Sequence, residues 1–487
     1  MSRAAILLTG FDPGYLRIME HQVKRERALA NEVVVLDLTR HMGGAADSYD
    51  RSILRIFGLD YPGHDLVERV ESLGATVETL EGEPRPASTP LPADVEERLQ
   101  IAVQSALITY FRTDRPARSR RRISKVESAL ATGGRAVYNA LLSYLGRTDI
   151  STLYVPNGRF PLQKMTELAA RDTATPVLHF EKGETSNGTY LKPYAPQDRL
   201  ASQADVNPTL RDLDTDEISS IADAWLARRA PSQDSSNEFS ALWDAGLPAE
   251  IAGIENASKV VGFFTSSQDE FVFLGPEWQL HEWADQFDAF DQLLTEFERD
   301  GYFMYLRVHP NLATKAQDCF AREREGIRTL QRKHPSLVVL WHDDSANTYG
   351  LLDHTDVVVV WDSTVGLEAS ARGIPVITAA TSRYGLVADV REILSKEDLQ
   401  ARGIQPWPVD SYKAKQFIAY LVRRDEQMDP DYSSWTPWAS SSPPLGAKIA
   451  ALAVAGGAPL MSESLASVID VYRHRSLRSN WRHLRSR

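Results

Sequence analysis

The amino-acid sequence predicts two doubly wound α/β domains in tandem. Apolar runs rich in Val, Ile and Leu alternate with amphipathic stretches through most of the 487 residues, which is typical of βαβ units and a mainly parallel sheet. The chain is too long for one ordinary core, and the polar residues 228–240 separate two such series. We predict an N-terminal domain over residues 1–248, a C-terminal domain over residues 249–430, and a loop, helix and basic tail over residues 431–487.

The first series of elements alternates short apolar runs with helical patterns. Strands are expected at residues 4–9, 31–39, 152–158 and 175–183. Amphipathic helices are expected at residues 93–111 and 124–146, and the proline-rich residues 81–96 indicate a surface loop.

The second series repeats this architecture without repeating the sequence. Its strands are expected at residues 259–267, 302–311, 336–344, 356–364 and 374–381, each followed by polar residues and a helix. In the fourth unit, "VVVVWDSTVGLEASARGIPVI", residues 357–361 form the expected strand and residues 365–372 the expected helix.

Composition excludes several classes of protein. The chain is 43% hydrophobic and 25% charged, as in soluble globular proteins, and Cys319 is its only cysteine, which excludes internal disulfides and thiolate metal clusters. No run resembles a secretory signal or approaches the roughly 20 apolar residues of a membrane span. We therefore expect a cytoplasmic protein. The net charge of −12 argues against general binding of nucleic acid.

Positive charge is concentrated in two segments, residues 112–125 and residues 472–487. Both are either solvated surface segments or sites of attraction to an anionic membrane, with Trp481 and Leu484 as shallow anchors in the second. The membrane alternative places the protein at the inner face of the cell membrane.

The polar residues that follow strands of the second series are candidates for a ligand site, because open α/β sheets bind ligands beyond the carboxyl ends of their strands. They are Ser266, Ser267, Arg307, His309, Asn311, Asp362, Ser363 and Thr364. Hydroxyls, an imidazole and a guanidinium together suit a phosphate, and the expected helix adds its N-terminus. Ordinary helix capping by Asp362 or Ser363 is the plain alternative.

Glu368, one turn into that helix, either accepts hydrogen bonds from a ribose or lies in solvent. A nucleotide is the implied ligand. No Gly-x-Gly-x-x-Gly follows the first strand and no P-loop occurs, so dinucleotide reductases and ATPases fit poorly. In the N-terminal half, Asn157 and Arg159 follow a strand in "PNGRF", where Arg159 either binds an anionic sugar or lipid phosphate or pairs with Glu181 or Glu184.

Five segments together resemble the capsular polysaccharide biosynthesis glycosyltransferases, a group that includes bacterial β-Kdo transferases. They are "VPNGRF", "HFEKGE", "FFTSSQDEF", "LRVHPN" and "DSTVGLEASARGIPVI", spread between about residues 150 and 385. The resemblance implies a GT-B fold of two Rossmann-like domains, with the acceptor bound mainly by the first, the nucleotide sugar by the second, and no metal.

The same resemblance implies partners and roles. His309, Ser363 and Thr364 are expected to contact the donor phosphate. The donor is expected to be a CMP-linked acidic sugar such as Kdo, with no other cofactor. The acceptor is expected to be a growing cell-surface polysaccharide or glycolipid.

Transfer of a sugar needs a carboxylate near the anomeric carbon or the acceptor hydroxyl. Asp269 and Glu270, after the first strand of the second series, are candidates for the former. Glu181 is the candidate for the acceptor proton, and Asp12 is its competitor.

Three other functions share parts of this pattern. A nucleotide-sugar 2-epimerase has a similar fold and a Ser-rich phosphate turn, but it usually shows Ser-Gly-Gly where this chain has Ser363, Thr364 and Val365. A teichoic-acid-type polyol-phosphate transferase and a non-catalytic GT-B-like binding protein are the other two.

Overall fold

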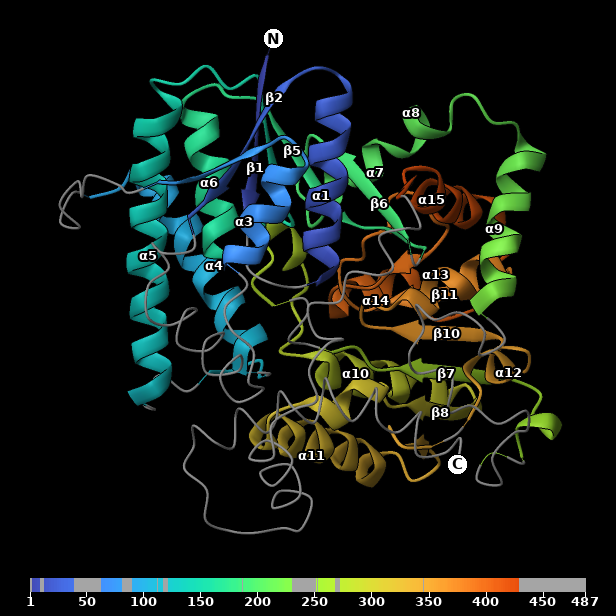
Figure 1. The fold of residues 1–487 in the computed structure, drawn as a ribbon. Coiled ribbons are helices and arrows are strands. Elements are labelled where there is room, and N and C mark those ends of the chain that lie inside the picture. Colours follow the sequence, from blue (N-terminus) through green and yellow to red (C-terminus); the bar gives the residue numbers. More distant parts are fainter. Residues whose placement is uncertain are drawn as a thin grey trace, which may run out of the picture.

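In the computed structural model, the chain forms two α/β domains, each built on one sheet with helices on both faces (Figure 1). The structure describes residues 2–8, 13–38, 63–80, 90–111, 113–116, 121–185, 187–229, 251, 253–267, 272–344 and 346–428. The predicted fold class is confirmed.

The N-terminal sheet has seven strands in the order β13-β6-β5-β4-β1-β2-β3. Its strands are β1 (Arg3–Leu8), β2 (Glu32–Asp37), β3 (Thr76–Thr79), β4 (Thr152–Pro156), β5 (Val177–Lys182), β6 (Gly188–Lys192) and β13 (Glu426–Gln427). The strands from β5 to β3 pair in parallel, while β6 pairs antiparallel with both of its neighbours. The order 3-2-1-4-5 around β1 is that of a Rossmann-like domain.

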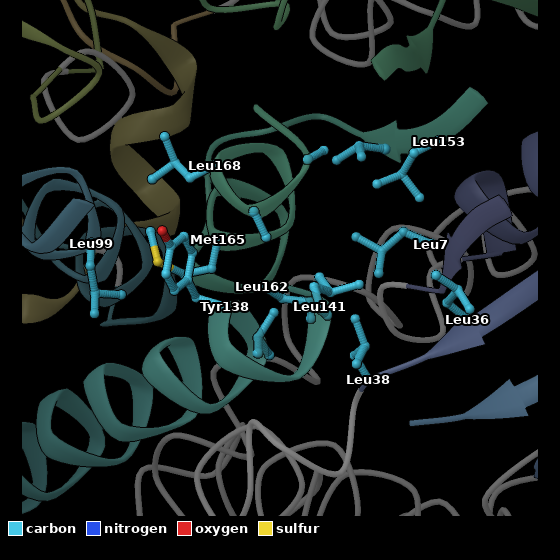
Figure 2. Packing of buried hydrophobic residues seen from close by; sticks show 14 of the residues in the cluster. Leu7, Leu36, Leu38, Leu99, Tyr138, Leu141, Leu153, Leu162, Met165 and Leu168 are labelled. Atoms are coloured by element: carbon cyan, nitrogen blue, oxygen red, sulfur yellow. The ribbon is translucent and has the colours of Figure 1, made fainter. Parts of the chain in front are cut away.

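Helices cover both faces of this sheet. One face packs against α4 (Ala93–Phe111), α5 (Arg121–Leu145) and α6 (Pro161–Asp172), in a core that Figure 2 shows from close by. The other face packs against α1 (Pro13–Ala28) and α3 (Gly63–Ser72). Because alternate residues of β2 are buried in the two different cores, the strand reads as an unbroken apolar run.

The C-terminal sheet is wholly parallel, with the order β12-β11-β10-β7-β8-β9. Its strands are β7 (Val260–Phe264), β8 (Phe303–Arg307), β9 (Val338–Leu340), β10 (Val357–Val360), β11 (Val376–Thr378) and β12 (Arg391–Glu392). Renumbered from β7, this is the Rossmann order 3-2-1-4-5-6, whose connections reverse direction between β7 and β10.

Two layers of helices enclose the C-terminal sheet. The helices α10 (Gln286–Arg299) and α11 (Gln317–Lys333) pack on one face. The helices α12 (Thr348–Leu352) and α13 (Thr364–Ala371) pack on the other. A short helix, α14 (Lys396–Arg402), follows β12.

The domains are joined by helices that pack together beside α13. The chain leaves the N-terminal sheet through α7 (Arg199–Ala204), α8 (Val206–Leu210) and α9 (Thr215–Arg229). It returns through α15 (Ser411–Arg423), which shares a hydrophobic cluster with α8, α9 and α13 (Figure 1). Strand β13 then joins the N-terminal sheet. Residues 230–250 and 429–487 lie outside the described residues, so both predicted domain boundaries and the basic tail stay predictions.

The predicted strands and helices correspond to the long buried elements. The sequence did not indicate β3, β6, β12 and β13, because these strands are short and have few fully buried apolar side chains. None of the helices in the described ranges is long and apolar enough to cross a membrane.

Candidate functional site

Three strand ends of the C-terminal sheet are joined by hydrogen bonds. The Ser266 hydroxyl, after β7, donates to the carbonyl oxygen of Asp362 (2.9 Å) and accepts from its backbone N–H (3.2 Å), which ties β7 to β10. The Asn311 amide, after β8, donates to the Ser267 hydroxyl (3.2 Å). The structure therefore brings together Ser266, Ser267, Asn311 and Asp362, as the strand-end rule predicts.

His309 belongs to the same group through its backbone and its ring. Its N–H donates to the Thr265 hydroxyl (2.8 Å), and its Nδ1 accepts from the N–H of Asn311 (3.1 Å). The ring thus caps the 3-10 helix η7 (Pro310–Thr314). Because Nδ1 is an acceptor, the proton of the neutral ring is on Nε2.

Ser363 caps α13, which is the plain alternative that the sequence left open. Its hydroxyl accepts from the N–H of Val365 (3.3 Å), and its carbonyl oxygen accepts from the Tyr384 hydroxyl (2.8 Å). Thr364 is exposed at the first position of the helix. Contact of these two hydroxyls with a phosphate stays a prediction.

Two of the predicted donor-site residues point away from this group. Arg307 donates to the carbonyl oxygens of Trp341 and Asp344 (2.8 Å to the latter), so it holds the turn after β9. Glu368 is buried, accepts from the Tyr349 hydroxyl (2.8 Å) and forms an ion pair with Arg229 of α9 (3.3 Å). Burial raises the pKa of Glu368, against the opposing effect of Arg229. The Glu368 side chain thus links α13 to α9.

Replacing Arg229 with Ala is expected to lower the free energy of unfolding by about 3–5 kcal/mol, because it leaves the buried carboxylate of Glu368 without its cation. The neighbouring Arg228, exposed on the same helix, provides the matched control. Arg228→Ala should change stability by less than about 0.5 kcal/mol. Denaturant unfolding of both variants makes the comparison, and equal stabilities would show that the ion pair is unimportant.

A cavity of about 620 Å³ opens between the two domains next to these strand ends. The strand ends contribute Trp361 and Asp362 after β10, and Ala380 and Thr381 after β11, to its wall. Asp362 Oδ2 and Thr381 Oγ1 are buried and have no hydrogen-bond partner among the described residues. Unsatisfied polar atoms beside a cavity are places where a ligand or water completes the hydrogen bonding.

Asp362 is the most strongly perturbed group of this cavity. Its side chain is 2% exposed, and burial raises its pKa to about 6, although Arg383 and Arg199 oppose the shift. A carboxylic acid that titrates near neutral pH in an interdomain cavity is a functional-site candidate.

A second cavity, of about 720 Å³, lies mainly against the N-terminal domain. Arg159 and Gly158 line it, and the Arg159 guanidinium donates to the Ser105 hydroxyl, not to Glu181 or Glu184. Phe273 lines both cavities. Its φ of 61° is unusual for a bulky residue and is a local strain of the kind found at functional sites. Phe273 therefore marks the junction of the two cavities.

Glu181 lies at the end of β5 within a network of donors. Tyr15 donates to both of its carboxylate oxygens (2.6 and 2.8 Å), and Asn157 donates to Oε2 (2.6 Å). Asn157 has a φ of 59° and accepts at Oδ1 from Gln197 (3.0 Å). The structure thus brings Asn157 and Glu181 together. Asn157 Oδ1 also accepts from the backbone N–H of Arg159 (3.1 Å), while the Arg159 guanidinium turns to Ser105.

The remaining carboxylates of the prediction, Asp12, Asp269 and Glu270, lie outside the described residues. Within the described part of the chain, no group of three or more His, Cys, Asp or Glu side chains could hold a metal ion.

Sequence reasoning did not identify several residues of the interdomain cavity. Thr381 is the last residue of a predicted strand that in the structure ends at Thr378, so the strand-end rule applied to the observed strand would have found it. Trp278, His281 and Asp285 come from a segment with no strand signal, and Arg115 comes from the basic run of the other domain. Nothing in the sequence shows that these segments meet.

Residues 279–389, which include β8, β10 and β11 and much of the cavity wall, match the model of a family described as Capsule polysaccharide biosynthesis protein. The resemblance to capsular polysaccharide biosynthesis proteins is confirmed over this segment. The match supports a part in capsule polysaccharide biosynthesis. No curated protein matches the sequence.

Solved structures to which this chain is similar include two glycosyltransferases and one epimerase. The β-Kdo 2,4 transferase KpsC of Thermosulfurimonas dismutans is 17% identical over 56% of this chain and 79% of its own, with a TM-score of 0.36. The UDP-GlcNAc 2-epimerase of Neisseria meningitidis is 12% identical over 94% and 100%, with a TM-score of 0.26. A glycosyltransferase of Rickettsia africae is 9% identical over 87% and 93%, with a TM-score of 0.27.

Proposed function

We propose that this protein is a glycosyltransferase of capsule polysaccharide biosynthesis, which takes a sugar from a nucleotide donor held at the interdomain cavity beside β10 and β11. The observation that carries the proposal is the cavity's polar wall, where the buried Asp362 and Thr381 leave oxygen atoms unpartnered. The family match over the same segment supports the assignment. A CMP-linked acidic sugar is the preferred donor, and a growing glycan is the acceptor.

The reaction requires few groups from the protein. The acceptor hydroxyl oxygen forms a bond to the anomeric carbon, and the bond from that carbon to the donor phosphate breaks. The acceptor proton passes to a carboxylate, for which Glu181 is the described candidate, and the nucleotide leaves with the electron pair of the broken bond. Hydrogen-bond donors at the strand ends stabilise the charge on the leaving phosphate.

Product analysis tests this proposal against its rivals. The protein is incubated with CMP-Kdo, UDP-GlcNAc or CDP-glycerol and a capsular oligosaccharide, and the products are separated by mass. We expect release of the nucleotide together with an oligosaccharide extended by one sugar. A free sugar epimer, a phosphodiester-linked product, or no product from any donor would each contradict the proposal.

A further inference from the structure

Arg115 is the only arginine or lysine among the described residues that line the interdomain cavity beside β10. It belongs to the N-terminal domain, in the segment between α4 and α5, whereas most of the cavity wall comes from the C-terminal domain. Its side chain is 64% exposed. The basic run that contains it was predicted to be solvated or to bind a membrane, and neither interpretation accounts for this position.

The segment that carries Arg115 is held against the C-terminal domain by its neighbours. Asp114 forms an ion pair with Arg322 of α11 (2.5 Å), and Arg322 also donates to the Thr113 hydroxyl (3.2 Å). These contacts fix the backbone beside the cavity and leave the Arg115 side chain outside the pair.

The contacts of Arg115 itself are loose. Its guanidinium lies 3.4 Å from Asp114 Oδ2 and 3.9 Å from Asp285 Oδ2. Each of the two carboxylates also binds another group. Asp114 pairs with Arg322. Asp285 caps α10 by accepting from the N–H groups of Phe287 and Asp288. Exposed ion pairs at such distances contribute little to stability. An anion in the cavity can therefore replace the two carboxylates as the partner of the Arg115 guanidinium at a small cost in free energy.

The acidic residues of the cavity make this cation necessary for an anionic ligand. Asp114, Asp285 and Asp362 all line it, and an unpaired phosphate among three carboxyl groups would meet like charge. A guanidinium offers a fork of N–H donors that matches two phosphate oxygens.

We propose that Arg115 is the residue of the N-terminal domain that binds the phosphate of the nucleotide donor. The inference rests on the proposed function and adds a positioning role: the donor, held by the C-terminal domain, is fixed to the N-terminal domain through one guanidinium. Binding of the donor thereby favours the arrangement in which both domains face the reacting carbon.

Isothermal titration of the full chain with CMP and with cytidine tests this role, with UDP and uridine in parallel. Arg115→Ala should weaken the binding of the nucleotide about tenfold or more and leave the affinity for the nucleoside unchanged. Only the nucleotide carries the phosphate that loses a charge-assisted hydrogen bond. Arg115→Lys should recover part of the loss. Arg211→Ala, which removes a 76% exposed arginine elsewhere in the same domain, should change neither affinity.

The outcomes separate this inference from the proposed function. Unchanged nucleotide affinity in Arg115→Ala, or an equal loss for nucleotide and nucleoside, overturns the role of Arg115 while the proposed function stands. A wild-type chain that binds neither CMP nor UDP overturns both.

Discussion

Asp362→Asn is expected to make the protein more stable at pH 7.5 and to lower its turnover at least 100-fold. The carboxyl group is buried and titrates at about pH 6 in the folded chain, against about 3.9 in an unfolded chain. Its raised pKa favours folding below about pH 4, and that contribution is lost as pH rises through 6. At pH 7.5 the ionised group therefore costs about 3 kcal/mol, which the neutral amide removes.

The activity loss has a separate cause. The desolvated carboxylate of Asp362 destabilises the fold at this pH, and its unpartnered oxygen lies beside the interdomain cavity. Under the proposed function, the carboxylate accepts a hydrogen bond from a ligand hydroxyl, and the loss of one such group at a reacting site typically costs 10²- to 10⁴-fold.

Asp425→Asn is the matched control for Asp362→Asn. Burial raises the pKa of Asp425 to about 6 as well, but its carboxylate accepts from the N–H of Glu184 (2.6 Å) in the hairpin between β5 and β6. We expect a gain in stability at pH 7.5 with turnover unchanged. Thermal midpoints between pH 4.5 and 7.5 and initial rates make the comparison. Full activity of Asp362→Asn would remove Asp362 from the site.

Glu181→Gln is expected to lower turnover by 10²- to 10⁴-fold while nucleotide affinity stays unchanged. The amide cannot take up the acceptor proton. Nucleotide affinity should not change, because Glu181, at the end of β5 in the N-terminal sheet, is not among the residues that line the cavity proposed to hold the nucleotide. Rates at saturating donor, together with titration by CMP, separate the two effects.

Tyr15→Phe is the matched control for Glu181→Gln. It removes a donor from the same network and leaves the carboxylate, so turnover should fall by less than tenfold. If turnover of Glu181→Gln itself falls by less than tenfold, the role of Glu181 is to hold Tyr15 and Asn157 in place by hydrogen bonds. Asp12 would then be the better candidate for the base.

Much of the fold follows from the sequence because the central strands are buried on both faces. The four valines of β10 are completely buried, so their run is visible without any tertiary information. Strand β13 has two exposed residues and forms only because α15 returns the chain to β6. Its existence depends on contacts that no local pattern encodes.

The site was predictable to the extent that strand ends determine it. Ser266 and Asp362 meet because β7 and β10 are parallel neighbours, and the order of strands in a doubly wound sheet brings their ends together. The direction of a side chain is a different matter. Arg307 turns to the loop after β9 and Glu368 turns to Arg229, because partners far away in the sequence satisfy them.

The cavity between the domains could not be read from either half of the chain. Arg115 and Thr381 lie 266 positions apart in the sequence and line the same cavity. Their approach depends on how α8, α9 and α15 pack together between the two sheets, which composition and periodicity do not specify.

The most direct test of the central claim is a thermal-shift titration of the full chain with CMP, UDP, GDP, CDP and ADP, repeated with Thr381→Val. A nucleotide at 100 times its dissociation constant should stabilise the wild-type fold by about 2.7 kcal/mol. The valine keeps the shape of Thr381 but lacks its unpartnered hydroxyl, so the shift should shrink or vanish in that variant. If no nucleotide raises the midpoint of the wild type, or if Thr381→Val shows the full shift, the interdomain cavity is not a nucleotide-donor site.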